Sequence, residues 1–211
     1  SYTGTGSAAT VGHGLASAPE FWLVKNRSVV KNWAVGTTQI PATNWMQLEQ
    51  TGGSDSGTTV WNSTYPSTSS INIGTATVTN ASGQDYIAYC WHSVTGYSKF
   101  GSYTGNGSAT GPVVTTGFSP AFVMIKRTDS TSHWEIHDTV REPNNPKTKL
   151  LNANQSNAED NNANSSVDFN ADNFQLKTSH AERNASGGTY IYMAFADTRE
   201  YAYWYDQSGN N

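Results

Sequence analysis

The sequence has few charged residues, no basic run and a single cysteine. Charged residues make up 13% of the 211 residues, and the net charge is −4. Because proteins that bind nucleic acid or anionic membranes present basic surfaces, we expect neither as a partner. The one cysteine, Cys90, excludes a disulfide within the chain and a cysteine-based metal site.

Long hydrophobic runs are also missing from the sequence. It therefore predicts neither a membrane span nor a signal peptide. Gly, Ser, Thr and Asn are frequent instead, and aromatic residues reach 12%. With so many aromatic and strand-forming residues the chain is not disordered. The composition favours an all-β protein with hydroxyl-rich and amide-rich loops, as in many extracellular and virion proteins.

The chain repeats itself over about half of its length. Ser1–Ser7 returns as Ser102–Ser108, a shift of 101 positions, and Asn80–Gly83 returns as Asn184–Gly187, a shift of 104. The small drift is typical of loop insertions between two copies of one structural plan. The repeat predicts two domains of common size, joined stiffly because no spacer separates them. The predicted boundaries are 1–100 for the first repeat, 101–204 for the second and 205–211 for the start of a linker or a further module.

Each repeat contains about six to eight short strand patterns with turn residues between them. The strongest patterns are Glu20–Lys25, Asp85–His92, Ala121–Arg127 and Thr189–Ala196, with Ala76–Val78 as one of the shorter strands. No window shows a helical stripe. The pattern predicts two tandem β-sandwiches, either jelly-roll and concanavalin-like or Ig-like. Strands with one polar side also suggest sheets with one face in water.

The aromatic residues divide into two groups. Trp33 and Trp134 recur at matching positions in apolar strands, which favours core packing. Trp45, Trp61 and the aromatic run near the C-terminus have no such counterpart, and flat rings of this kind stack on sugar faces. Core burial explains each of them equally well when taken singly. The candidates for contact with a glycan or another subunit are Trp45, Trp61, Tyr203 and Trp204.

The most reactive-looking phrase is His137–Arg141, which contains Asp138. A glycosidase would need a second carboxylate, for which Glu135 is the nearest candidate. The matching place in the first repeat, around Gly36, has neither an acid nor a base. An ion pair between Asp138 and Arg141 that holds a loop explains the phrase more simply.

The histidines form no short ligand pair, because His133 and His137 are about 13 Å apart along a strand. One zinc ion could not bind both of them without a bend. We therefore expect no metal, no cofactor and no catalysis.

Several phrases together resemble a known family. They are Tyr86–Trp91, Gly96–Gly107, Gly117–Arg127, Asp138–Arg141 and Asn184–Tyr192. They are similar to a tandem β-repeat domain of large virion and tail-appendage proteins of marine bacteriophages, including phages of cyanobacteria. The resemblance covers both repeats, and the end of the chain is similar to the start of a following module in such proteins.

The resemblance implies a structural and adhesive segment of a phage tail fibre, spike or knob, located on the virion surface and outside cells. Its expected partners are other virion proteins, further copies of the chain (a trimer, as in many fibres) and host cell-surface polysaccharide. His137, Asp138 and Arg141 join the four aromatic residues above as candidate ligand-binding residues.

Three other functions stay open at this point. The first is a secreted, lectin-like carbohydrate-binding module. The second is an architectural spacer or capsid decoration. The third is a glycan hydrolase or lyase that uses Asp138 or Glu135.

Overall fold

The computed structural model describes residues 1–161 and 163–197 and confirms the predicted all-β class. Its strands form four antiparallel sheets. Within the described ranges, the two α-helices are single turns, α1 (Thr77–Asn80) and α2 (Ala181–Asn184). No helix among the described residues has the length and apolar character needed to cross a membrane.

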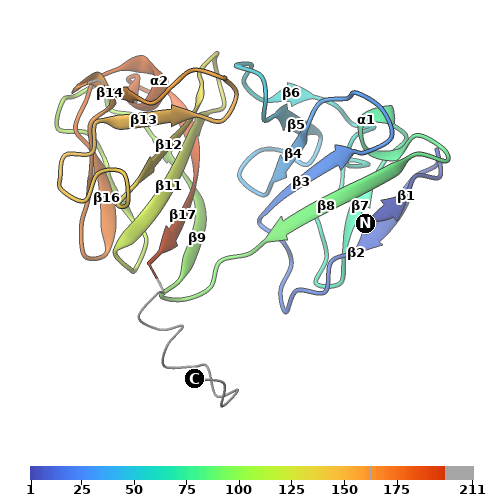
Figure 1. Cartoon of the computed structure of the whole chain (residues 1–211). Coiled ribbons are helices and arrows are strands. Elements are labelled where there is room, and N and C mark those ends of the chain that lie inside the picture. The colour runs from blue at the N-terminus through green and yellow to red at the C-terminus, as the bar shows by residue number, and fades with distance from the viewer. Residues whose placement is uncertain (162, 198–211) are drawn as a thin grey trace.

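The first half of the chain contains one large and one small sheet (Figure 1). The small sheet pairs β2 (Ala9–Gly12) with β7 (Ser70–Ile73). The large sheet has six strands in the order β1 (Tyr2–Thr3), β8 (Asp85–Trp91), β3 (Phe21–Asn26), β4 (Ala34–Thr37), β5 (Asn44–Gln47) and β6 (Asp55–Ser56).

The second half again contains a six-stranded sheet and a smaller one. The small sheet has the order β10 (Val113–Thr115), β16 (Asn173–Leu176) and β15 (Val167–Phe169), and a 3-10 turn, η1 (Ala163–Ser165), precedes β15. The large sheet has the order β9 (Ser98–Thr104), β17 (Thr189–Ala196), β11 (Pro120–Arg127), β12 (Trp134–Asp138), β13 (Lys149–Asn152) and β14 (Asp160–Asn161).

The two six-stranded sheets have the same strand order. β9, β17, β11, β12, β13 and β14 take the places of β1, β8, β3, β4, β5 and β6. This order agrees with the sequence repeat, although the division into two domains stays a prediction. The predicted boundary at residues 100–101 falls inside β9, and residues 205–211 lie outside the described part of the chain.

Three apolar clusters lie between the sheets. One packs the first six-stranded sheet against the β2–β7 pair, with Trp22, Trp61 and Ile71 at its centre. Another packs the second six-stranded sheet against β10, β15 and β16, with Phe174 and Tyr190 fully buried.

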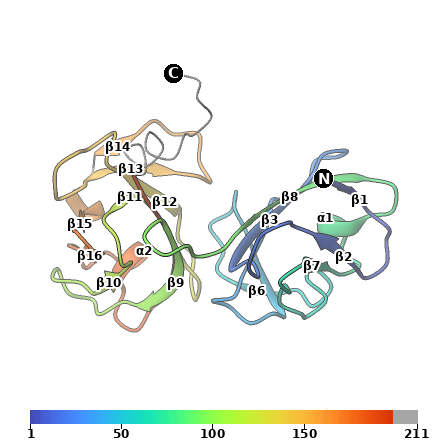
Figure 2. The same ribbon diagram turned by 90° about the horizontal axis from the view of Figure 1, so that it is seen from below.

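The third cluster, which we call the shared core, contains residues of both halves, among them Leu23 and Met193. The two six-stranded sheets therefore face each other across it (Figures 1 and 2). The prediction that each sheet has one face in water is wrong for the central strands, because they are covered on both sides.

Polar contacts also tie the two halves together. The Trp134 indole donates a hydrogen bond to the Gln47 carbonyl at 3.0 Å, and the Lys126 ammonium donates one to the Thr51 carbonyl at 2.7 Å. Trp134 is 1% exposed, as expected for a core residue, whereas its counterpart Trp33 is half-buried. These contacts and the shared core join the two halves.

The predicted strand at Ala76–Val78 is wrong, because this stretch leads into helix α1. The cause lies in a buried amide that no local pattern reveals. The Asn80 side chain donates hydrogen bonds to the carbonyls of Ser7 (2.6 Å) and Gly74 (2.7 Å), and the Tyr86 hydroxyl donates to the Thr77 carbonyl (2.7 Å). These bonds fix the chain in one helical turn.

The same arrangement recurs at α2. The Asn184 side chain donates to the carbonyls of Ser108 (2.8 Å) and Thr178 (2.7 Å), and the Tyr190 hydroxyl donates to the Ala181 carbonyl (2.7 Å). The repeated Asn-Ala-Ser-Gly phrase of the sequence thus marks the same set of hydrogen bonds around a one-turn helix in both halves.

Candidate functional site

The polar pocket of the second half is the candidate site. It has a volume of about 460 Å³ and lies between β13, helix α2 and the segment around β14. The size is within the usual range for ligand sites. Its walls consist of His133, Leu150, Asn152, Gln155, Asn157, Ala158, Glu159, Asp160, Ser165, His180, Glu182 and Arg183.

A buried ion pair forms the floor of this pocket. Arg183 of α2 and Glu135 of β12 are 2% and 1% exposed. The guanidinium donates from Nε to one carboxylate oxygen at 2.6 Å and from Nη2 to the other, so the pair is bidentate. Arg183 also donates to the carbonyl of Asn164. A fixed fork of this kind holds α2 against the sheet with little freedom of orientation.

Burial and pairing have opposite effects on the charge of Arg183. Burial is the largest single effect and alone would lower the pKa of the guanidinium, but the charge and hydrogen bonds of Glu135 together with the charge of Glu182 raise that pKa. For Glu135 burial is the larger effect and raises the pKa of the carboxyl, against the opposing attraction of Arg183. The bidentate geometry commits the two side chains to each other.

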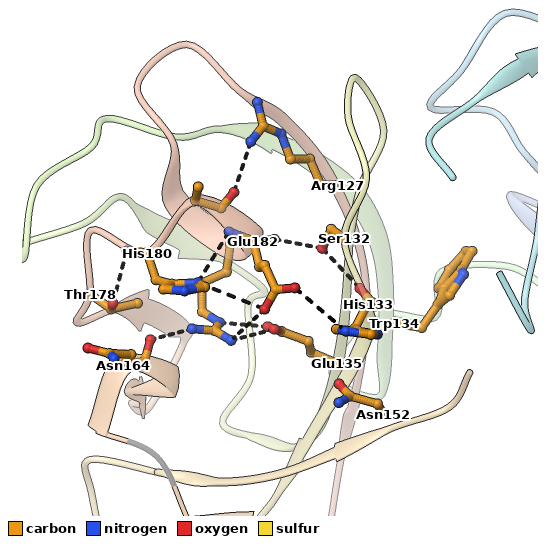
Figure 3. A network of polar contacts seen from close by, with 12 residues as sticks. Arg127, Ser132, His133, Trp134, Glu135, Asn152, Asn164, Thr178, His180 and Glu182 are labelled. Atoms are coloured by element: carbon orange, nitrogen blue, oxygen red, sulfur yellow. Dashed lines mark hydrogen bonds and ion pairs between the residues drawn. The ribbon is translucent and has the colours of Figure 1, made fainter. Parts of the chain in front are cut away.

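Glu182 lies beside this pair, between two imidazoles (Figure 3). Its carboxylate is 3.9 Å from Nε2 of His133 and 3.8 Å from Nδ1 of His180. His180 is the N-cap of α2, where its ring accepts a hydrogen bond from the Glu182 amide. A one-turn helix thus carries Glu182 and Arg183 into the pocket at adjacent positions.

Two buried polar atoms of the pocket residues have no hydrogen-bond partner among the described residues. They are the side-chain carbonyl oxygen of Asn152 and the hydroxyl of Ser165. Ser165 is fully buried. Because a buried polar atom without a partner costs about 1–3 kcal/mol, a ligand that satisfies these atoms would gain affinity.

The predicted Asp138–Arg141 ion pair is present at the edge of this region. Nε of Arg141 donates to Asp138 at 2.5 Å, and Nη1 donates to Glu159 at 3.1 Å. Glu159 also lies 3.4 Å from the ammonium of Lys149. The loop prediction was therefore confirmed, and Glu159 connects the loop to the rim of the polar pocket.

Two of the predicted ligand-binding residues are buried. Trp61 is 1% exposed and packs edge-to-face on Trp22 at a centroid distance of 5.5 Å. His137 is fully buried, and burial lowers the pKa of its imidazole to about 3. Burial excludes direct contact of either side chain with a surface glycan.

The remaining predicted residues lie elsewhere. Trp45 is half-buried at a separate hollow of about 470 Å³ in the first half, which Lys31 and Thr77 also line. Tyr203 and Trp204 lie outside the described residues. The structure thus does not bring the predicted residues together in one site.

No group of three or more His, Cys, Asp or Glu residues suited to hold a metal ion occurs within the described ranges. The side chains that line the polar pocket are mostly amides and carboxylates, which can hydrogen-bond to a ligand.

Comparison with known proteins gives one match. Residues 1–199 match the family described as Domain of unknown function (DUF7483). The chain belongs to this family. No curated protein and no solved structure matches the chain. The match covers both six-stranded sheets, so the family domain contains the shared core and the polar pocket.

Sequence reasoning missed most residues of the polar pocket, although a signal for its floor was present. Glu135 replaces Ala34 of the first repeat, and Arg183 replaces Thr79. Two opposite charges that appear together at apolar or small positions of a repeat point to a buried pair. His133, His180 and Glu182 likewise stand where the first repeat has Asn32, Ala76 and Val78. The pocket residues between 155 and 165 give no such signal.

Proposed function

We propose that the chain is a structural and adhesive segment of a phage virion appendage that contacts host-surface glycans without catalysis. The polar pocket carries the adhesive part of this proposal. Its lining offers the side-chain amides of Asn152, Gln155 and Asn157 beside the carboxylates of Glu182 and Asp160. Such a site suits a saccharide with many hydroxyl groups.

Absence of catalysis is supported by the state of the carboxylates considered for it. Glu135 is held by Arg183, and Asp138 accepts hydrogen bonds from the backbone amide and the guanidinium of Arg141. A glycosidase needs one carboxyl group that donates a proton to the leaving group and a second that either attacks the sugar or activates a water molecule. Neither group is available for these roles.

The structural part of the proposal rests on the shared core. Four sheets packed into one body make a stiff unit without any disulfide, as an appendage outside a cell requires. The resemblance of the sequence to virion proteins of marine bacteriophages supports the virion part of the proposal. A pure spacer would need the same stiffness but would have no use for a polar pocket with unpaired buried atoms.

The test is binding of the fluorescently labelled chain to bacterial cells with and without their surface polysaccharide. We expect saturable binding that is lost when the polysaccharide is stripped. Gln155→Ala should weaken it about tenfold, which corresponds to one lost hydrogen bond of about 1.4 kcal/mol. Gln155 is exposed, so the folded state should persist.

Gln50→Ala is the matched control, because Gln50 is also exposed but lies in the first half, away from the polar pocket. It should leave binding unchanged. Equal binding to stripped cells would refute the glycan contact. Folded chain that binds no cells at all would favour the spacer function instead.

A further inference from the structure

A second hollow lies in the first half, at the place that the polar pocket takes in the second half. It has a volume of about 470 Å³ and lies between strand β5, helix α1, the loop before β4 and the segment after β6. We call it the tryptophan hollow, because Trp45 forms one of its walls. Its size is within the usual range for ligand sites, as is that of the polar pocket.

Strand pairing shows that the tryptophan hollow and the polar pocket occupy corresponding places. Trp45 of β5 stands two residues before the partner of Ala34. Leu150 of β13 stands two residues before the partner of Glu135, which replaces Ala34 in the second repeat. Trp45 and Leu150 therefore correspond, and each of them lines its own site.

Three further pairs of lining residues correspond in the repeat. They are Asn32 and His133, at a shift of 101, and Ala76 and His180 with Val78 and Glu182, at a shift of 104. The walls of the hollow thus come from positions that also form walls of the polar pocket. The common plan of the repeat contains one site, which the two halves keep with different side chains.

The two sites differ in the charge that they offer a ligand. The polar pocket is lined by the carboxylates of Glu159, Asp160 and Glu182, and the guanidinium of Arg183 is bound in its ion pair. Among the described residues that line the tryptophan hollow, Lys31 is the charged one. Its side chain is exposed, and its ammonium makes no hydrogen bond or ion pair within residues 1–161 and 163–197. Coulomb attraction therefore favours an anionic ligand in the hollow and disfavours it in the polar pocket.

The ring of Trp45 is held in place by its surroundings. A Cβ atom on Gly57 would lie 2.4 Å from the indole, so the ring lies directly on the Gly57 backbone. The ring also packs against the apolar cluster that contains Trp22 and Ile71, and it stays half-buried. Trp45 is thus a fixed aromatic wall of the hollow. Flat rings of this kind stack on the apolar faces of pyranose sugars, because they present a large area with few freely rotating bonds.

Hydrogen bonds join the other walls of the hollow to each other. The Ala76 amide donates to the Thr59 carbonyl at 3.0 Å, and the Gly74 amide donates to the Val60 carbonyl at 3.0 Å. The Thr79 hydroxyl of α1 donates to the same Val60 carbonyl at 3.2 Å. These bonds tie α1 to the segment after β6. The hollow is therefore formed without a ligand, and binding costs little ordering of the chain.

Polar side chains of the hollow offer partners for hydroxyl groups. The Asn32 amide donates to the side-chain oxygen of Gln47, which leaves the carbonyl oxygen of Asn32 as an acceptor. Thr59 and Thr77 also line the hollow, and neither hydroxyl makes a hydrogen bond among the described residues. Each hydroxyl can both donate and accept. A few polar groups and one cation around an aromatic ring suit a ligand that is a sugar and carries an acidic group.

We infer that the tryptophan hollow is a second saccharide site of the chain and that it binds an acidic sugar of the uronic acid class. The pyranose ring stacks on Trp45, and the carboxylate pairs with the ammonium of Lys31. This site extends the proposed glycan contact to the first half, and it binds its sugar whether or not the polar pocket is occupied. Two sites on one chain strengthen attachment to a surface that carries many copies of a polysaccharide.

The test is titration of the chain with oligomers of glucuronate, galacturonate and mannuronate, followed through the indole N–H signal of Trp45 in NMR spectra. Trp45→Phe removes this signal and thereby assigns it. We expect the signal to move saturably with at least one acidic oligomer. The methyl ester of that oligomer, which keeps the rings and loses the charge, should bind at least about tenfold more weakly, and so should the acid to Lys31→Gln. Because Lys31 is exposed, this variant should keep the fold.

Lys99→Gln is the matched control, because Lys99 is also an exposed lysine but lies in β9, away from the tryptophan hollow. It should leave binding unchanged. If none of the acidic oligomers moves the Trp45 signal of the folded chain, or if acids and methyl esters bind equally, the inference is wrong. Binding that is weakened by Gln155→Ala and not by Lys31→Gln would place the acidic sugar in the polar pocket and would overturn the inference as well.

Discussion

At the scale of single residues, the two repeats fill the same space with different pairs. In the first half Trp22 lies opposite Gly36, and a Cβ atom on Gly36 would lie only 2.1 Å from the Trp22 ring. In the second half Val123 lies opposite His137. In the first half the larger residue, Trp22, is on β3, whereas in the second half the larger residue, His137, is on β12, the counterpart of β4. His137 therefore fills the space that Trp22 fills in the first half. This packing role explains why a histidine that looks reactive in the sequence is buried.

The buried imidazole of His137 should make the protein sensitive to acid. Its pKa is about 3 in the folded state, whereas an unfolded histidine has a pKa of about 6.5. Between these values the unfolded chain binds the additional proton, so stability is complete above about pH 6.5 and falls as pH decreases toward 3. The expected slope from this residue is about 1.4 kcal/mol per pH unit.

Urea unfolding of the native chain and of His137→Leu from pH 4 to 7 measures this effect. We expect a steeper loss of stability in the native chain, whatever the absolute stability of the variant. His13→Leu is a suitable control, because His13 is not fully buried and lies in the first half. Equal slopes for all three chains would contradict the prediction.

At the scale of elements, the buried ion pair decides where helix α2 lies. Arg183 has two bonds to Glu135 and one to the Asn164 carbonyl, so it joins α2, β12 and the turn η1. Removing one partner leaves the other charged and buried. Such a loss costs about 3–5 kcal/mol, while replacing both partners with apolar residues is often neutral.

We therefore expect Arg183→Met to destabilise the protein by about 3–5 kcal/mol and Glu135→Leu/Arg183→Met to recover most of this loss. Chemical denaturation of both variants and of Glu135→Leu alone gives the coupling between the two sites. Thr79→Met, at the matching position of α1, controls for bulk at this place in a helix. If the double variant is as unstable as the single one, the pair does not act as a unit.

The strands were readable from the sequence because their apolar patterns are strong. Phe21–Asn26, Pro120–Arg127 and Thr189–Ala196 correspond to the predicted segments within one or two residues. Helix α1 was not readable, because a bond from the Asn80 side chain to Ser7, far away in the chain, decides it. Local propensity carries no information about such long-range partners.

The candidate site was less predictable than the fold. Asp138 and Arg141 pair within one turn, and a local pattern was enough to find them. Glu135 and Arg183 are 48 positions apart, and only a comparison of the repeats singles them out. The unpaired hydroxyl of Ser165 depends on the packing of the surrounding loop, which the sequence does not encode in any short motif.

At the scale of the whole molecule, the shared core decides how the protein unfolds. Phe21, Met46 and Trp134 of different halves pack in one cluster, and Phe21 and Trp134 meet edge-to-face at 6.4 Å. Separation of the halves would expose this apolar surface to water, at a cost that grows with its area. The two halves should therefore unfold together rather than one after the other.

A core mutation in the first half tests this coupling. Ile71 of β7 is fully buried against the first six-stranded sheet, outside the shared core. Ile71→Ala should cost about 2–5 kcal/mol. If the halves unfold as one unit, hydrogen exchange of the most protected amides in β16, which lies wholly in the second half, should accelerate by the same free energy. Phe174→Ala, in the outer core of the second half, should produce the converse effect on β7.

Calorimetry of the same chains completes the argument. One transition, with a calorimetric enthalpy equal to the van't Hoff enthalpy, is expected for the native chain and for both variants. Two transitions, of which each variant shifts only one, would show that the halves are independent and that their contact is a weak interface.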